Sequence, residues 1–350
     1  MNNKNKGLPA EVLINLARTE SLADSEKDQL LTLLSKGLDS KESEDFLSII
    51  KGEKLPSLSS DVIAKKIFDP EEHPERLEYL LQNASGENDI HVVGPAKMEG
   101  YVGFYDSKRL IHDIPAMLDD GRISDTEVQV KAQEFIFPRA ELYGSDLLLI
   151  QYSAKRGDKA SVTYENVNGV LLLILMSESP NVIRNYQTER YIHRFDKRVA
   201  DSGLSYEPLC KTVYIQLDKA LEQLKEGLNG EEDLRLQLLL AAMKDINDPF
   251  VRQEMEKDDF FSDIIEEVTT LSQDKEVQIM LLAEKYAMAD IATMKSMERA
   301  EGRAEGGNDM LYRLVQNGRL SVFDGAEEMG VTEDTFLSNM KLCGFEPPKK

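Results

Sequence analysis

The sequence predicts an α/β protein whose core, residues 57–225, carries helical extensions at both ends. Three observations support this fold class. The apolar run at residues 170–176 (VLLLILM) is typical of a fully buried strand. Two strand-like runs, residues 109–117 and 122–130, flank an Asp-Gly pair that favours a hairpin. Apolar residues recur at helical spacing towards both ends of the chain.

The first part of the chain is predicted to be helical. Apolar residues follow a helical pattern in residues 8–18, 25–36 and 40–51, and we assign residues 1–55 to a helical N-terminal extension. The polar, proline-containing stretch that follows indicates a linker. Residues 61–82 are again helical, interrupted at Asp69-Pro70.

Strands and helices alternate within the core. Residues 90–93 are a further strand candidate, and residues 134–153 return to a helical pattern. Residues 212–216 (TVYIQ) form a strand that leads into a helix ending near Lys225. A central mixed sheet flanked by helices is the simplest arrangement of these elements.

Glycines at 227 and 230 mark the end of the core. Residues 231–297 form a charged helical region, whose acidic side chains we interpret as solvated surface. The repeat in residues 297–308 (MERAEGRAEGGN) predicts a hinge, and residues 298–350 follow as a small helical unit. Thr332 is positioned to cap the last helix of that unit.

Composition limits the functions that the chain can perform. The formal net charge of -22 argues against a large surface that tracks phosphates, so any DNA contact should be local and assisted by a metal. Cys210 and Cys343 lack metal-ligand spacing and are expected to be free thiols in a reducing compartment. The N-terminus lacks the apolar segment of a signal peptide, and no apolar run could span a bilayer. We therefore expect a cytoplasmic protein without membrane contact.

Asp113, Glu127 and Gln129 are the candidate catalytic residues. Glu127 and Gln129 share one face of a strand because side chains alternate. A three-residue turn, with Gly121 in the left-handed conformation, brings Asp113 directly opposite Glu127, with Cβ atoms about 5 Å apart. A two-residue turn would put the carboxylates on opposite faces. We predict the three-residue turn.

Two opposed carboxylates repel each other unless a cation lies between them, and hard oxygen ligands suit Mg²⁺ or Mn²⁺. Asp113 and Glu127 are therefore the predicted metal ligands. Such an ion can lower the pKa of a water and polarise a phosphoryl oxygen. Gln129 could orient the attacking water, but an amide cannot act as a base. The alternative is that these residues are only the solvated face of a hairpin.

Further motif residues extend this pattern over residues 57–225 and again over residues 295–340. With them, the chain resembles the Rpn family of recombination-promoting nucleases and transposase-like proteins, within the PD-(D/E)XK nuclease superfamily. Ala64 replaces the usual phenylalanine of the opening motif, and the first 55 or so residues have no recognised counterpart. The residues that carry the resemblance are Asp61, Lys65, Phe68, Lys108, the segment 111–114, Asp120-Gly121-Arg122, Glu127-Val128-Gln129, Arg139, Tyr143, Gln151, Gly157, Tyr164 and the C-terminal Arg-Ala-Glu-Gly repeat.

The resemblance implies a restriction-endonuclease-like PD-(D/E)XK core and a metal-dependent DNA endonuclease. It implies metal binding at Asp113 and Glu127, with Gln129 in the place of the superfamily's usual lysine.

Four other residues carry two interpretations each. Asp61 either joins the catalytic carboxylates or only caps its helix. Lys108 either contacts phosphate or is simply exposed. Arg139 and Tyr143, four residues apart on one helix face, either bind the substrate or serve the core. His112 is expected to point to the opposite side of the sheet.

Three hypotheses remain open from the sequence. The chain is a Mg²⁺-dependent DNA endonuclease, or a catalytically silent protein-interaction member of the fold, which the acidic charge favours. The third is an accessory factor of recombination or transposition that binds DNA around Arg313 and Arg319. The amphipathic C-terminal helices are compatible with a homodimer.

Overall fold

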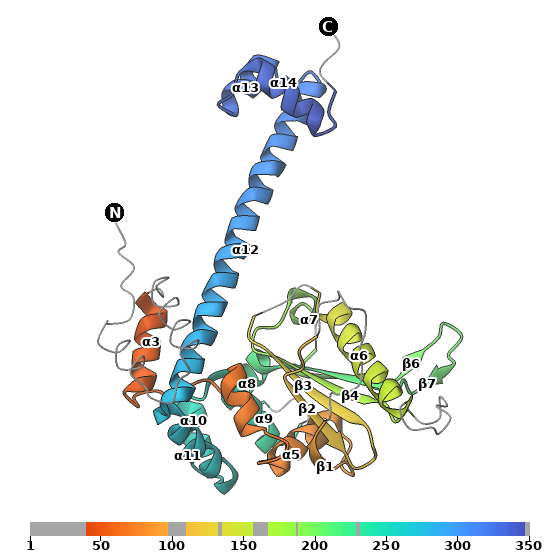
Figure 1. The fold of residues 1–350 in the computed structure, drawn as a ribbon, viewed down its shortest axis with the longest axis vertical. Coiled ribbons are helices and arrows are strands. Elements are labelled where there is room, and N and C mark those ends of the chain that lie inside the picture. Colours follow the sequence, from red (N-terminus) through yellow and green to blue (C-terminus); the bar gives the residue numbers. More distant parts are fainter. Residues whose placement is uncertain are drawn as a thin grey trace. The chain divides into compact units, whose positions relative to one another are not determined.

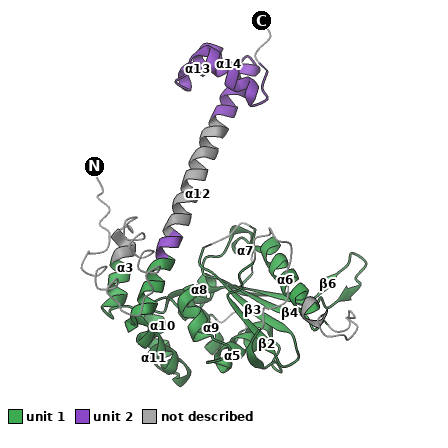
Figure 2. Cartoon of the chain, in the orientation of Figure 1, with its two compact units in different colours: residues 1–284 green, residues 285–350 purple. Residues whose placement is uncertain are grey.

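The computed structural model describes residues 40–96, 110–131, 135–156, 167–186, 188–228 and 232–346. The chain divides into two compact units, Met1–Glu284 and Lys285–Lys350 (Figure 2). The helices predicted at residues 8–18 and 25–36, and the motif residues Lys108, Gly157 and Tyr164, lie outside the described residues.

A six-stranded mixed sheet forms the centre of the first unit, in the order β1-β2-β3-β4-β8-β5 (Figure 1). The three inner strands β3, β4 and β8 run parallel, whereas β1, β2 and β5 pair antiparallel with their neighbours. The α/β class with a central mixed sheet is therefore confirmed. The strands are β1 (Val92–Pro95), β2 (Ile114–Leu118), β3 (Ile123–Gln129), β4 (Val170–Met176), β5 (Ile192–Phe195) and β8 (Cys210–Gln216).

Strand β4 is buried along its whole length, as its apolar sequence predicted. Its even-numbered residues pack under α6 (Ile136–Arg156), together with α6 side chains such as Leu147. Its odd-numbered residues point to the other face, where α5 (Pro74–Ser85) and α8 (Leu217–Glu226) contact the sheet (Figure 1). Helices thus cover both faces, and α6 covers the face that carries Glu127.

The β2–β3 hairpin has the predicted three-residue turn. Ile114 pairs with Thr126 and Met117 with Ile123, and the Gly121 N–H donates to the Leu118 carbonyl. Gly121 has a φ of +83°, in the left-handed region that other residues rarely adopt. The turn sets the register that places Asp113 beside Glu127 at the open end of the hairpin.

Replacing Gly121 with alanine is expected to lower the free energy of unfolding by about 2–3 kcal/mol. Besides the conformational cost, a Cβ would lie 2.0 Å from Asn168 Nδ2, so Asn168 must move. Gly203→Ala is the matched control, since its φ is +85° and no atom lies within 4 Å of the added Cβ. It should cost only about 1 kcal/mol. Urea unfolding measures both, and equal losses would show that Asn168 yields freely.

The sequence did not predict three short strands, β5, β6 (Arg198–Val199) and β7 (Ser205–Tyr206). The last two form a separate two-stranded ribbon. All residues of β6 and β7 are exposed, so they carry no alternation of buried and exposed positions. Strand β5 pairs only with β8, and its IHRF sequence lacks the pattern of a half-buried strand.

Within the described residues, the first helix is α3 (Ser40–Ile50), which matches the helix predicted at residues 40–51. Helix α4 (Asp61–Ile67) is separated from α5 at the predicted Asp69-Pro70 break. The region after the core is all-helical, with α9 (Leu234–Asp245), α10 (Pro249–Met255) and α11 (Asp259–Gln273) each capped by an aspartate. A short α7 (Asn181–Arg184) follows β4.

The second unit contains the C-terminal part of α12 (Lys275–Gln316), α13 (Val322–Glu328) and α14 (Glu333–Leu342). The Thr332 hydroxyl accepts from the Thr335 N–H, so its predicted capping role is confirmed. Helix α12 is continuous through the Arg-Ala-Glu-Gly repeat, and the division between the units falls at Glu284 instead of residue 297. The predicted hinge does not appear, because glycine lowers helix propensity without terminating a long helix.

Across the described residues, none of the helices combines the length and the apolar character that a bilayer crossing requires.

Candidate functional site

Three polar side chains line up on one face of β3 under α6. Asp125, Glu127 and Gln129 alternate along the strand and are 0%, 1% and 5% exposed. Their partners on β4 are the buried apolar residues Leu172, Ile174 and Met176. These side chains are therefore not a solvated hairpin face, and that alternative is wrong. Burying such groups costs free energy unless they are paired, so their placement requires an explanation.

Asp113 and Glu127 meet as the hairpin register requires. The Asp113 N–H donates to Glu127 Oε1 at 3.2 Å, and the Val128 N–H donates to Asp113 Oδ2 at 2.9 Å. Burial, followed by the charges of Asp113 and Asp125, raises the pKa of Glu127 to about 9, against an ordinary value of 4.5. Burial also raises the pKa of Asp113, with a smaller contribution from Asp61. The two carboxyl groups are thus poorly stabilised as anions.

Asp61 approaches this pair from the first turn of α4. It forms an ion pair with Lys65 at 2.7 Å, and its charge raises the pKa of Asp113. It does not cap α4. That role falls to Glu284, which accepts from the Ser60 hydroxyl at 2.5 Å and from the Asp61 N–H at 2.9 Å. The capping interpretation of Asp61 is wrong, because a residue of α12 already provides the acceptor.

His112 belongs to the same cluster, contrary to the sequence expectation. Its Nδ1 lies 2.7 Å from Asp125 Oδ2, and its Nε2 lies 3.2 Å from Asp146 Oδ2 of α6. Residue 112 precedes β2, so strand alternation does not determine its direction. Burial disfavours the charged ring, but the two aspartates outweigh this effect and raise the pKa of His112.

Helix α6 closes the site with Arg139 and Tyr143. The Arg139 guanidinium lies 3.4 Å from Glu127 Oε2, donates to the Tyr143 hydroxyl at 2.8 Å, and stacks over the Tyr143 ring. Burial and the charge of Glu127 raise the pKa of Tyr143 to about 12. Tyr143 is also part of the core beneath α6, so its core interpretation is confirmed, and its substrate-binding interpretation stays a prediction. Arg139 thus places a guanidinium directly beside the buried carboxyl group of Glu127.

The residues fit a divalent cation. One ligand atom from each of His112, Asp125 and Glu127 lies within 4.8 Å of the other two. Asp125 Oδ1 and both polar atoms of the Gln129 amide are buried without a hydrogen-bond partner in the described part of the chain. Unpaired buried oxygens beside mutually repelling carboxylates are what a hard cation and its water would satisfy. Of the predicted ligand pair, Glu127 belongs to this group together with Asp125 and His112, whereas Asp113 is not one of the three.

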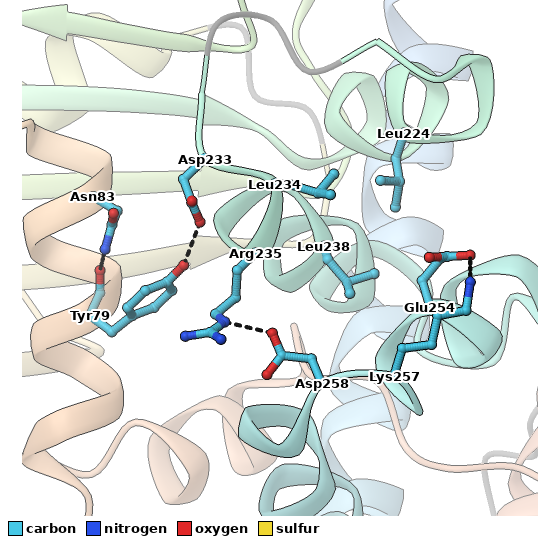
Figure 3. A pocket seen from close by; sticks show the side chains of 10 residues that line it. All are labelled: Tyr79, Asn83, Leu224, Asp233, Leu234, Arg235, Leu238, Glu254, Lys257 and Asp258. Carbon is cyan, nitrogen blue, oxygen red and sulfur yellow. Dashed lines mark hydrogen bonds and ion pairs between the residues drawn. The ribbon is translucent and has the colours of Figure 1, made fainter.

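A cavity of about 560 Å³ lies elsewhere in the first unit. The charged groups that line it pair with one another (Figure 3). The Tyr79 hydroxyl donates to Asp233, and Arg235 donates to Asp258. Lys257 pairs with Glu254 at its rim. Because these groups are already paired, this cavity offers no comparable cluster of unsatisfied ligands.

Comparisons with protein-family models, with curated proteins and with solved structures give no match to this chain.

Proposed function

We propose that this chain is a metal-dependent DNA endonuclease with a restriction-endonuclease-like PD-(D/E)XK core. The observation that carries the proposal is the buried, mutually repelling carboxylate cluster of Asp113, Asp125 and Glu127, next to the unpaired amide of Gln129. His112 and Arg139 each contact one of these three buried acids, which is incomplete compensation for the whole cluster, so a purely structural role accounts poorly for their placement. The resemblance to the Rpn family adds the association with recombination or transposition.

Asp113, Asp125 and Glu127 would hold Mg²⁺ or Mn²⁺ through carboxylate oxygens, with His112 adjacent. When bound, such an ion supplies Lewis acidity toward a phosphoryl oxygen and a more acidic water. Gln129, whose buried amide has no hydrogen-bond partner among the described residues, would orient the attacking water. It carries no charge, so stabilisation of a phosphate anion falls to cationic side chains.

Arg139 and Lys65 are cationic side chains next to the carboxylate cluster. Arg139 lies beside Glu127, and Lys65 pairs with Asp61 near Asp113. Each is more than one-third exposed, so each can reach a phosphate at the surface. We propose that they position the DNA backbone, with Tyr143 holding Arg139 in place. Lys108 keeps its predicted role as a phosphate contact.

The silent-protein alternative draws on the net charge of -22, which weakens DNA affinity. It leaves the unpaired Gln129 amide and Asp125 Oδ1 without a role, so we favour the nuclease.

Cys210 and Cys343 are free thiols, in keeping with a reducing, cytoplasmic setting.

The test is cleavage of supercoiled plasmid by the full-length protein with Mg²⁺ or Mn²⁺. We expect nicking that EDTA abolishes and that Asp113→Ala lacks at equal purity. Equal cleavage by wild type and Asp113→Ala would point to a contaminant or a misplaced site. If neither protein cleaves under any metal, the silent-protein alternative replaces the nuclease.

A further inference from the structure

A second cavity, of about 420 Å³, lies on the same face of the sheet as the carboxylate cluster. Four aromatic residues line it: Phe137 of α6, Phe195 of β5, Tyr214 of β8 and Tyr186, which follows α7. Its volume is within the range of small-ligand sites. Such a concentration of rings is unusual for a chain with 7% aromatic residues.

The sheet register fixes the distance between the cavity and the candidate catalytic residues. Glu127 pairs with Ile174, and Ile174 pairs with Tyr214. Tyr214 in turn pairs with His193, which also lines the cavity. Neighbouring strands lie about 4.8 Å apart, so Tyr214 is about 10 Å along this row from Glu127. Ile174 and Tyr214 both pack under α6, which places the row on the α6 side.

The first turn of α6 contacts both the cavity and the carboxylate cluster. Phe137 and Arg139 are two residues apart and so project about 200° apart around the helix. Arg139 contacts Glu127, whereas the Phe137 ring packs against Tyr214 at 5.2 Å and Phe195 at 6.2 Å between centroids. The two side chains therefore leave the first turn of α6 in nearly opposite directions, Phe137 towards the cavity and Arg139 towards the carboxylates.

The aromatic surface of the cavity is partly open. Phe137, Phe195 and Tyr214 pack edge to face and fix one another, with Phe195 and Tyr214 at 5.5 Å. Phe195 remains 52% exposed and Tyr186 68% exposed. Phe195 is thus an exposed ring held on a rigid base, with the exposed ring of Tyr186 in the same lining, and exposed aromatic faces are suited to stacking against a flat apolar ligand.

The charge of the cavity indicates which flat ligand it takes. The lining includes three basic residues, Arg190, His193 and Arg194. Among the described residues that line the cavity there is no aspartate or glutamate. Arg194 donates two hydrogen bonds of 2.9 Å to Glu232, and His193 contacts the Gln216 amide, so the lining is basic in composition and holds no carboxylate of its own. In a chain of net charge -22, this is a local exception. Aromatic faces beside basic groups are the features that bind unpaired nucleobases and their phosphates.

We propose that this cavity binds an unpaired base of single-stranded DNA by stacking on Tyr186 and Phe195, and so presents that strand to the carboxylate cluster. The proposal rests on the proposed nuclease function for its purpose, but base binding can be measured without cleavage. In a duplex the bases are already stacked and paired, so they cannot enter the cavity. The preferred substrates are therefore single strands and the unpaired parts of branched DNA.

The experiment uses the full-length protein and a short oligothymidylate that contains one 2-aminopurine, in EDTA at low salt. Stacking quenches the fluorescence of the 2-aminopurine, and the titration gives the affinity. We expect quenching by wild type and affinity for the single strand above that for the matching duplex. Tyr186→Ala should weaken single-strand binding about tenfold, the effect of losing one base–aromatic stack.

Two variants serve as controls. Tyr186→Phe keeps the ring and should bind within about twofold of wild type. Tyr206→Ala removes an equally exposed tyrosine, 61% exposed on β7, and should leave binding unchanged. Absence of quenching, equal affinity for duplex, unchanged binding by Tyr186→Ala, or displacement by equimolar thymidine monophosphate would each overturn the proposal.

The same protein in Mg²⁺ separates this proposal from the nuclease function. Quenching without cleavage of any DNA would reject the nuclease and keep the base site. Cleavage of duplex and single strand at equal rates, without quenching, would reject the base site and keep the nuclease.

Discussion

Glu127→Gln is expected to stabilise the metal-free protein at alkaline pH and to abolish its response to Mg²⁺. The pKa of Glu127 is raised from 4.5 to about 9 by burial and by the neighbouring aspartates. Between these two pH values the unfolded chain releases this proton while the folded chain retains it. The folded state then binds more protons than the unfolded state, so stability falls as pH rises through this window. Above pH 9 the contribution is constant.

Glutamine keeps the shape of the side chain and removes this dependence. The melting temperature of Glu127→Gln without metal should exceed that of wild type by roughly 5 °C at pH 8, the response of a domain of this size to ~2 kcal/mol. At pH 4.5 the two proteins should melt together. Wild type should gain thermal stability from Mg²⁺, more so at higher pH because proton and metal compete for the carboxylate.

Thermal unfolding followed by circular dichroism between pH 4.5 and 9 measures these differences. Glu267→Gln is a suitable control, since it also removes a glutamate from the first unit but lies in α11, with Arg76 and His73 as partners. A wild-type protein that is insensitive to Mg²⁺ at every pH would contradict the metal site.

Asp125→Asn is expected to reduce metal-dependent cleavage by at least ~1000-fold, since a cation–oxygen contact in the site contributes several kcal/mol to the transition state. Asp125 is fully buried, and its Oδ1 has no hydrogen-bond partner among the described residues. The amide preserves volume, and its oxygen can still face His112. The loss should therefore report the missing charge at the metal.

Asp146→Asn is the matched comparison. Asp146 contacts the other nitrogen of His112 and is 24% exposed. Asp146→Asn should lower the rate of metal-dependent cleavage about tenfold, as is typical when a residue that hydrogen-bonds a metal ligand is replaced. Plasmid cleavage rates over a range of Mn²⁺ concentrations compare the two variants. If Asp125→Asn loses no more than Asp146→Asn, Asp125 only orients His112, and Asp113 and Glu127 hold the metal alone.

The local geometry of the hairpin could be predicted because it depends on local chemistry. The Asp-Gly turn and strand alternation were sufficient to place Asp113 beside Glu127. Strand β4 was equally predictable, since an uninterrupted apolar run can only be buried. The same alternation also places Asp125 on the face of Glu127, so this residue could have been found from the sequence.

The contributions of α6 and of His112 could not be predicted in this way. Asp146 and Arg139 reach the cluster because α6 packs across β4 and β8, an arrangement that depends on long-range contacts. His112 lies in an irregular segment, where no periodicity fixes the direction of a side chain. Tertiary packing decides both outcomes.

The hydrogen bonds that Glu284 accepts from Ser60 and Asp61 have a consequence for the order of folding. They join positions 224 and 223 residues apart in the chain. On a ribosome, the first turn of α4 has no such acceptor until nearly all of the first unit has been synthesised. The helix that carries Asp61 is therefore fixed late, and the carboxylate cluster becomes complete only in a chain that has reached α12.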